Sequence, residues 1–268
     1  RSPSNGLSRL ARCYPPSTGA MAFQDKLRFF TALAFASLLC SARAQDGPAG
    51  VLMAIKAGLT AGAEKLDSWA NEADLCTAWD FVTCEATADG EKVVALDLKG
   101  LDLTGSIPNQ ISALTDLDSL NLAENNFSGQ LPFTWGQLTR LTNLVVRDNN
   151  LEGTLPPAFR GMLSLRSLIL TGNNISGTIP EQWSQLGDLQ FVAIRDNNLT
   201  GPLPQSWEQT TLKWIYLTTN NLTGPLPSTW AKMTGLLELD LGENNLTGML
   251  PQEWASLPLL NTIQLGEN

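Results

Sequence analysis

One pattern, L-x-x-L-x-L-x-x-N-x-L-x-G-x-[IL]-P, returns along about two thirds of the 268-residue chain and limits the possible fold more than any other feature. The units follow one another in steps of 24 residues, with one step of 23, and they begin at Val93, Leu117, Leu141, Leu165, Leu189, Leu212, Leu236 and Leu260. A unit of this length cannot bury its apolar residues alone, so neighbouring units must stack and share one interior. The sequence therefore predicts a solenoid.

Aliphatic residues, mostly leucine, occupy positions 1, 4 and 6 of each unit. The alternation at positions 4 and 6 predicts a short strand that points these side chains inward. Strands of successive units are expected to form one parallel sheet with a spacing of about 4.8 Å. The side chains at positions 3 and 5 are then expected on the outer, concave surface of that sheet.

Two further columns repeat with the leucines. Position 9 is asparagine, whose side-chain amide can both donate hydrogen bonds to and accept them from the backbone of a turn. Leu101 replaces it in the first unit. The asparagines are Asn125, Asn149, Asn173, Asn197, Asn220, Asn244 and Asn268. Position 13 is glycine in all seven complete units, from Gly105 to Gly248. This pattern predicts a sharp turn with a short second strand, in which glycine supplies a backbone conformation or a close approach that other residues resist. We interpret both columns as structural.

Three residues after the proline stands an aromatic residue in six units, with Ile111 in the first. The six are Trp135, Phe159, Trp183, Trp207, Trp230 and Trp254. Stacking against carbohydrate is one interpretation of such a column. Its regular recurrence, with leucine or methionine usually three residues later, favours a role in the core on the convex side.

The first 44 residues are expected to lie outside the fold. Residues 21–44 have a basic start, a mostly apolar run of twelve residues over 29–40 and an Ala-Arg-Ala site ending at Ala44, which is the order of a secretory signal peptide. A membrane anchor is the alternative, but the run falls short of the roughly 20 residues that span a bilayer. Residues 1–20 precede the first methionine, and we interpret them as upstream sequence.

Charge and composition exclude several classes of function. The formal net charge is −9, and residues 45–268 carry 11 basic and 25 acidic residues, a net charge of −14. Such a surface repels nucleic-acid phosphates and anionic lipids, so neither is an expected partner. The chain has no histidine, which excludes Ser-His-Asp and Cys-His catalysis and most zinc sites. No cofactor or metal is expected.

The segment VLMAIKAGLTAGAEKLDSWANEADLCTAWDFVTC, residues 51–84, resembles the N-terminal cap of plant-type leucine-rich repeat proteins, and L-x-G-x-[IL]-P resembles the extension in their repeats. The resemblance covers residues 47–268. It implies an α/β solenoid: a right-handed superhelix with a parallel concave sheet, short helical or 3-10 segments on the convex side, a cap over 45–92 and repeats over 93–268. Phe81 departs from the family, which usually has glycine there, so the tight turn of the cap is expected to differ.

The same resemblance implies extracellular recognition. Members of the family are often receptor-kinase ectodomains, secreted inhibitors or anchored surface antigens, and the L-P-x-x-W form of the repeat also resembles surface proteins of green algae and trypanosomatids. The sequence ends within the eighth unit and shows no C-terminal cap, so we expect a fragment whose membrane attachment, if it has one, lies in a missing C-terminal segment.

The cap can also be interpreted from its own residues. Val51, Leu52, Ile55 and Leu59 fall on one face of a predicted helix. After export Cys76 and Cys84 are the only cysteines left, which predicts a disulfide in an oxidising compartment. Metal binding is the weaker alternative, because two cysteines without histidine supply too few ligands.

The candidate binding residues lie at positions 3, 5 and 7 of units three to six, where the array is apolar and its ends are polar. They are Val145, Ile169, Phe191, Ala193, Trp214 and Tyr216, with Arg147 and Arg195 beside them. An exposed apolar patch on an acidic protein predicts an interface, and Trp and Tyr are typical anchors. The alternative is that these side chains only stabilise the exposed sheet through cross-strand contacts.

Five sequons for N-glycosylation follow the asparagine column by one residue, at Asn126, Asn174, Asn198, Asn221 and Asn245. The repeat N-N-L-T-G generates them automatically, but export would make at least partial glycosylation expected.

The leading hypothesis is a secreted or cell-surface recognition module that binds a protein, peptide or glycan ligand through its concave face. A structural wall or matrix protein and an inhibitor of a secreted enzyme are the alternatives. A carboxylate-dependent enzyme would need two carboxyl groups about 5 to 9.5 Å apart in a cleft. Acidic pairs exist on adjacent units, for example Glu124 with Asp148, but aligned surface charges are expected on any acidic solenoid, so we predict no enzymatic activity.

Overall fold

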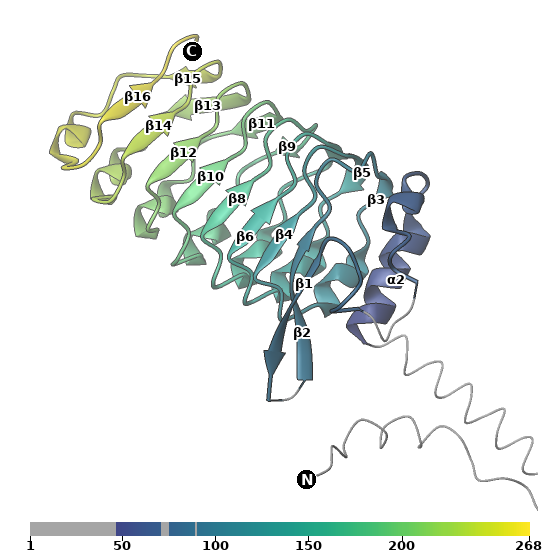
Figure 1. Ribbon diagram of the computed structural model, residues 1–268. Helices are drawn as coiled ribbons and strands as arrows, with labels where there is room; N and C mark the ends of the chain where they lie inside the picture. Colours follow the sequence, from purple (N-terminus) through teal and green to yellow (C-terminus); the bar gives the residue numbers. More distant parts are fainter. Residues whose placement is uncertain (1–46, 71–74, 89) are drawn as a thin grey trace, which may run out of the picture.

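The protein, seen in a computed structural model, is described over residues 47–70, 75–88 and 90–268. The predicted signal peptide, residues 21–44, and the segment before it, residues 1–20, lie outside the described residues. Successive coils stack along one axis from the cap to the last unit (Figure 1). The predicted solenoid is confirmed.

The main sheet lines the concave face. Within the described residues it has nine strands: β1 (Val82–Thr87), β2 (Gly90–Asp97), β4 (Ser119–Asn121), β6 (Asn143–Val145), β8 (Ser167–Ile169), β10 (Phe191–Ala193), β12 (Trp214–Tyr216), β14 (Glu238–Asp240) and β16 (Thr262–Gln264). From β2 onward the strands are parallel, and the register joins equal positions of neighbouring units, for example Leu144 with Leu168. Rows of equivalent side chains therefore run across the sheet.

Shorter strands after position 9 of the repeat form two further parallel sheets. One contains β3 (Thr104–Ser106), β5 (Asn126–Gln130) and β7 (Asn150–Glu152), and the other contains β9 (Ser176–Gly177), β11 (Asn198–Gly201), β13 (Asn221–Pro225) and β15 (Asn245–Thr247). All seven glycines at position 13 have positive φ, for example 77° at Gly177. The expected turn with a short second strand is confirmed.

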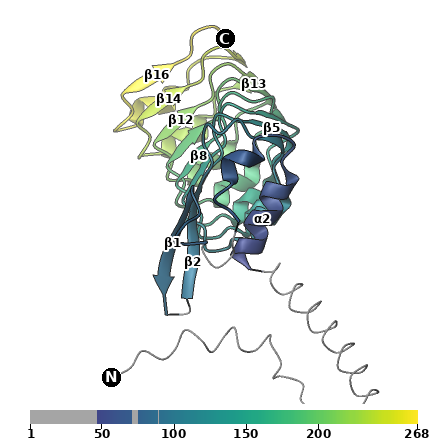
Figure 2. The ribbon, with the colours of Figure 1, turned by 45° about the vertical axis from the view of Figure 1, so that its right-hand side comes forward.

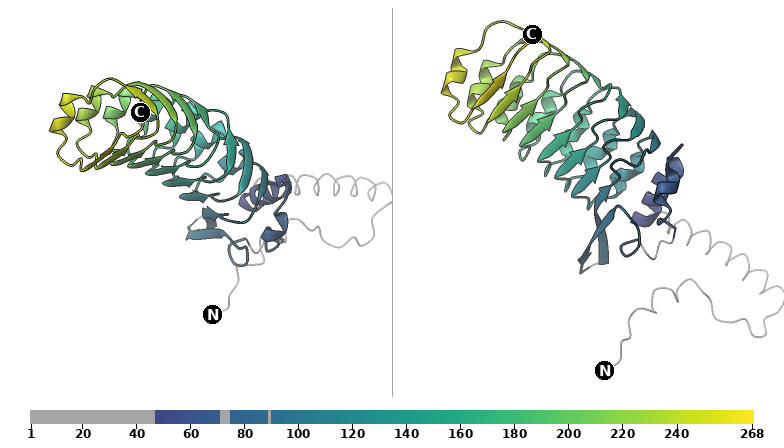
Figure 3. Two further views of the ribbon diagram at one scale, coloured as in Figure 1. Left: turned by 90° about the horizontal axis from the view of Figure 1, so that it is seen from above. Right: turned by 45° about the horizontal axis from the view of Figure 1, so that its top comes forward.

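A column of 3-10 helices runs along the side of the coils opposite the main sheet and completes each coil (Figure 3). These helices are η4 (Asn109–Ala113), η5 (Phe133–Gln137), η6 (Pro157–Gly161), η7 (Glu181–Gln185), η8 (Gln205–Gln209), η9 (Ser228–Lys232) and η10 (Gln252–Ser256). Each one follows the proline of L-x-G-x-[IL]-P, whose fixed φ suits the residue before a helix begins.

The aromatic column points inward from these helices and is buried, as the core interpretation predicted. Neighbouring rings stack: the centroids of Phe159 and Trp183 are 6.1 Å apart, and those of Trp230 and Trp254 are 6.1 Å apart with an interplanar angle of 4°. The Trp183 indole also donates a hydrogen bond of 3.1 Å to the Pro156 carbonyl of the preceding coil. The column therefore joins coil to coil.

The asparagine column satisfies the backbone of the turns. Asn149 accepts a hydrogen bond of 2.9 Å from the Phe127 N–H in the preceding unit and donates to the Leu122 and Val146 carbonyls at 3.0 and 3.2 Å. Equivalent bonds recur in the other units, and the asparagines from Asn125 to Asn244 are buried. Because buried backbone groups need partners, this column is structural, as predicted.

The single 23-residue unit loses its residue on the outer side of the coil. In the preceding unit the 3-10 helix is followed by Leu186, whereas here Thr210 stands three residues after Trp207 and ends η8, with its hydroxyl donating to the Trp207 carbonyl at 2.7 Å. The main sheet keeps its register across this unit, since Phe191 still pairs with Trp214. The shortening therefore leaves the concave face aligned.

The cap covers the first coil with helix α2 (Pro48–Gly58) and a short 3-10 helix, η2 (Ala63–Leu66) (Figure 2). Val51, Leu52 and Ile55 are buried as predicted, but Leu59 lies one residue beyond the helix and is only partly buried. Cys76 and Cys84 form a disulfide with Cα atoms 5.5 Å apart. The cap is thereby cross-linked where its helical part meets the first strand.

Strand β1 was not predicted: it pairs antiparallel with β2 and forms a hairpin at the start of the otherwise parallel sheet. Phe81, directly before it, has a φ of 67°, and its carbonyl accepts a hydrogen bond of 2.9 Å from the Asp97 N–H. Phe81 thus adopts the left-handed conformation that glycine favours. The expectation that the turn differs from that of the family is therefore corrected. The side chain of Phe81 departs from the family, but its backbone has the conformation that glycine favours.

Candidate functional site

Alternation along the main strands decides which side chains reach the concave surface. In β12, Ile215 is completely buried, whereas Trp214 and Tyr216 on either side of it are partly exposed. Similar alternation holds in β8, where Leu168 points inward. The predicted placement of positions 3 and 5 on the concave face is therefore correct.

Three rings from two neighbouring strands form an aromatic cluster: Phe191, Trp214 and Tyr216. The Phe191 centroid lies 5.4 Å from that of Tyr216 in an edge-on arrangement and 6.3 Å from that of Trp214 in a tilted one. These are favourable geometries for aromatic pairs, worth about 0.5 to 1.5 kcal/mol each beyond burial of area. All three side chains remain partly exposed to solvent.

Arg195 crosses over this cluster. Its guanidinium carbon lies 4.2 Å from the centre of the Tyr216 ring, and its Nη2 atom is 3.0 Å from Oδ2 of Asp240. The side chain therefore extends from the coil of β10 across β12 to β14. Asp240 is 7% exposed and also accepts a hydrogen bond from the Thr218 hydroxyl.

Tyr216 is a hydrogen-bond donor held in its neutral form. Its hydroxyl donates to Oε2 of Glu238 at 2.6 Å. Burial raises the pKa of Tyr216 to about 12, and the hydrogen bond and negative charge of Glu238 act in the same direction. Lys213 approaches the same cluster, with its Nζ atom 5.9 Å from the centre of the Trp214 ring.

The predicted apolar patch is narrower than expected. Ala193 is 5% exposed, because its small side chain lies between the larger residues Phe191 and Tyr216, so it is not part of the accessible surface. Val145 and Ile169 are register partners on β6 and β8 and are partly exposed, which leaves them as an aliphatic flank of the aromatic cluster.

Arg147 belongs to a different group. It forms ion pairs with Glu124 and Asp148, and Lys99 lies 3.3 Å from Glu124. Burial acts to raise the pKa of Glu124, but hydrogen bonds and charges from Lys99 and Arg147 outweigh it and lower the pKa overall. A glycosidase acid needs a raised pKa, so Glu124 does not have the character of a general acid.

Besides Lys213, two residues of β14 next to the cluster were not among the predicted site residues: Glu238 and Asp240. Both stand at positions 3 and 5, in register with Trp214 and Tyr216. The sequence placed them at the polar end of the array. Their place in the repeat could have predicted this proximity, because residues at equal positions of successive units are neighbours on a stacked sheet.

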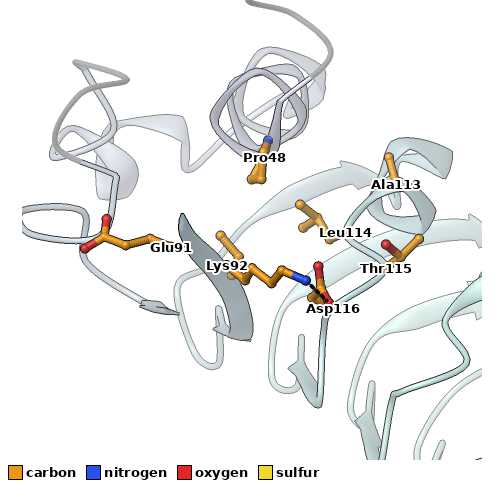
Figure 4. A pocket seen from close by; sticks show the side chains of 8 residues that line it. Pro48, Glu91, Lys92, Ala113, Leu114, Thr115 and Asp116 are labelled. Carbon is orange, nitrogen blue, oxygen red and sulfur yellow. Dashed lines mark hydrogen bonds and ion pairs between the residues drawn. The ribbon is translucent and has the colours of Figure 1, made fainter. Parts of the chain in front are cut away.

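Two small hollows of the described surface lie away from the aromatic cluster. One, of about 60 Å³, lies between α2, β2 and the segment after η4, where Lys92 pairs with Asp116 at 3.2 Å (Figure 4). The other, of about 210 Å³, lies in the last coils beside Leu250 and Leu265. Both are smaller than the roughly 300 to 1,000 Å³ of a usual small-molecule site. The described residues also contain no cluster of three or more side chains suited to hold a metal ion.

The five sequon asparagines are exposed and lie at or next to the starts of the short strands β5, β9, β11, β13 and β15. They are therefore separated along the coil from the strands that carry the aromatic cluster. Glycosylation of these residues stays a prediction.

Comparison with known proteins shows that the chain belongs to the leucine-rich repeat family. The model described as "Leucine rich repeat N-terminal domain" matches residues 49–85, and two models of the repeat itself match residues 116–138 and residues 139–199 and 210–268. The matches agree with the division into cap and repeats seen in the fold.

Within this family the chain is similar to plant receptors. Receptor-like protein 7 of Arabidopsis thaliana is 42% identical over 62 residues, which cover 22% of this chain and 6% of that protein. The crystal structure of the ectodomain of the Arabidopsis membrane receptor kinase GASSHO1/SCHENGEN3 has a TM-score of 0.71 and 27% identity, covering 81% of this chain and 29% of that one.

The Arabidopsis receptor kinase HAESA, solved with the peptide hormone IDA and the co-receptor SERK1, gives a TM-score of 0.65 at 30% identity over 82% of this chain and 41% of that chain. The chain thus spans less than half the length of each of these relatives. Among its described residues, no helix has the length and apolar character needed to cross a bilayer.

Proposed function

We propose that this chain is an extracellular recognition module that binds a polypeptide ligand across the concave sheet, with the aromatic cluster of Phe191, Trp214 and Tyr216 at the centre of the contact. The observation that carries the proposal is the partial exposure of three contacting rings on a sheet whose equivalent positions elsewhere are mostly small or polar. Aromatic residues of this kind dominate the binding energy of many interfaces.

The similar structures support a polypeptide ligand. GASSHO1/SCHENGEN3 was solved in complex with CASPARIAN STRIP INTEGRITY FACTOR 2, and HAESA with a peptide hormone and a co-receptor. A stacked parallel sheet presents several strands to one extended ligand, which suits this mode of binding.

The competing interpretation is that the rings only stabilise the sheet. Their mutual contacts and the ion pair of Arg195 with Asp240 do contribute stability. Loss of stability and loss of binding must therefore be measured separately, on the same variants.

A direct test starts with selection of ligands for the secreted chain from a display library of random twelve-residue peptides. Trp214→Ala is expected to weaken the selected peptides by at least about 30-fold, which corresponds to a hot spot of about 2 kcal/mol. Phe133→Ala is the matched control, because Phe133 is 68% exposed on the convex helix η5 and its loss should leave affinity unchanged.

Failure to enrich any peptide, or equal affinity for Trp214→Ala and the parent chain, would contradict the proposal. Binding of wall oligosaccharides in place of peptides, lost in Trp214→Ala, would assign the same surface to a glycan ligand. Retention in a detergent-insoluble extracellular fraction without ligand binding would favour a matrix protein.

Export is part of the same proposal. Expression of the full sequence in a eukaryotic host should release a chain that begins near Gln45 into the medium. Glycosidase treatment should then reduce its mass if any of the exposed sequon asparagines is modified. An unprocessed chain that stays inside the cell would contradict the extracellular location.

A further inference from the structure

Acidic side chains border the aromatic cluster on the side of the last coils. Glu238 and Asp240 of β14 are the register partners of Trp214 and Tyr216. Asp240 is paired with Arg195. Glu238 accepts the Tyr216 hydroxyl and forms no ion pair with any described residue. One partly exposed carboxylate beside the rings therefore lacks a cationic partner.

The rings themselves already attract cations. The Arg195 guanidinium lies over the Tyr216 ring and the Lys213 ammonium over the Trp214 ring, at 4.2 and 5.9 Å from the ring centres. Both distances fall within the range of cation–π attraction, which is worth about 0.5 to 2 kcal/mol depending on solvent exposure. The contacts with Arg195 and Lys213 thus show that these rings favour a cationic group.

The net charge of the surrounding coils also favours a cationic ligand. Residues 189–268 contain seven acidic and three basic residues, a net charge of −4, and their ion pairs within the described residues are Arg195 with Asp240 and Lys232 with Glu208. In residues 117–188 the balance is six acidic to four basic residues. A cationic ligand is therefore drawn toward the half of the solenoid that carries the aromatic cluster.

On the basis of the proposed function, we infer that the ligand is a basic peptide, bound in an extended form, with an arginine or lysine that lies against Trp214 and Tyr216 and pairs with Glu238. The charge complementarity selects a cation, and the open sheet selects a chain that can cross several strands. Apolar residues next to that cation would contact the flank formed by Val145 and Ile169.

The test uses the peptides selected from the random library. We expect the tightest binders to be net positive and to contain at least one arginine or lysine next to apolar residues. Exchange of the critical arginine for citrulline, which keeps its shape but not its charge, should weaken binding by about tenfold, roughly the effect of one cation–π contact combined with one ion pair. Binding should also weaken as salt concentration rises.

A double-mutant cycle then assigns the cation to Glu238. Glu238→Gln, whose amide oxygen can still accept from Tyr216, should weaken the arginine peptide by about tenfold and the citrulline peptide by less than about twofold. Glu253→Gln is the matched control, since it makes the same charge change at an exposed site on the convex helix η10 and should alter neither affinity.

The outcomes separate this inference from the function on which it rests. Peptides that lose binding with Trp214→Ala but tolerate citrulline and Glu238→Gln would overturn the inference and leave the proposed function standing. Enrichment of neutral or acidic peptides would do the same. Absence of any peptide ligand would overturn both.

Discussion

Two groups of aromatic residues occupy opposite sides of the same coils and behave differently. The convex column is completely or almost completely buried, its rings lie nearly parallel, and several of its indoles donate to proline carbonyls. The concave cluster is partly exposed, its rings are tilted or edge-on, and its contacts are to charged side chains. The convex residues return in units two to seven, whereas the concave ones occur in only two neighbouring units.

The difference separates architecture from recognition in a repeat protein. A side chain that contacts its own equivalents in the adjacent coils must recur, because each coil completes the interior of its neighbour. A side chain needed for one ligand has no reason to recur. Periodicity therefore marks the core, and a local exception on the exposed face marks the candidate site.

The largest expected effect comes from the convex column. Trp183→Ala should lower the free energy of unfolding by about 3 to 5 kcal/mol, because it removes a fully buried ring that stacks on Phe159. Trp214→Ala on the concave face should cost much less, since its ring is partly exposed. Urea denaturation of both variants measures the contrast, and equal losses would break the distinction between the two groups.

A smaller effect is expected within the pair Asn173 and Asn174. Asn173→Ala should cost about 1 to 3 kcal/mol, because the buried Leu151 N–H loses its acceptor and the Val146 and Leu170 carbonyls each lose one of their donors. Asn174→Ala, one residue along and exposed, should stay within about 0.5 kcal/mol of the parent. Both variants are produced without glycosylation, because Asn174 is a sequon asparagine and a glycan on it could itself change the stability. Similar losses for both variants would contradict the structural role of the repeated column.

The smallest effect concerns alkaline pH. The folded pKa of Tyr216 is about 12, above the roughly 10 of an unfolded tyrosine, so the unfolded chain loses this proton first. The stability linked to this group is fully present below pH 10 and declines as pH rises toward 12. Tyr216→Phe should flatten that part of the stability curve. Parallel curves for the two proteins would show that the hydroxyl is not held neutral by its surroundings.

Much of the fold followed from repeated residues alone. The repeated leucines, asparagines, glycines and tryptophans each predicted their environment, because every copy occupies the same position in its coil and contacts equivalent neighbours. The antiparallel strand β1 occurs once, before the first repeat, and its pairing is fixed by contacts that no repeat pattern encodes. The left-handed backbone conformation of Phe81 was likewise not predicted, since a phenylalanine in the sequence gives no sign that its φ is positive.

The candidate site was predicted only in part. Position in the repeat placed Phe191, Trp214 and Tyr216 correctly on the concave face. It did not show that Ala193 would be hidden between larger neighbours, because burial of a small side chain depends on what flanks it. Nor did it show that Arg195 would extend across β12 to Asp240, since a long flexible side chain can choose among several acidic partners within reach.

The unit with 23 residues shows how this architecture tolerates change in length. Its missing residue is absorbed where η8 ends, while Phe191 and Trp214 remain opposite each other on the sheet. Insertions and deletions on the outer arc can therefore accumulate without shifting the inner rows. The inner surface, in turn, is free to vary by substitution, one side chain at a time, so length and specificity can evolve on separate faces of the same coil.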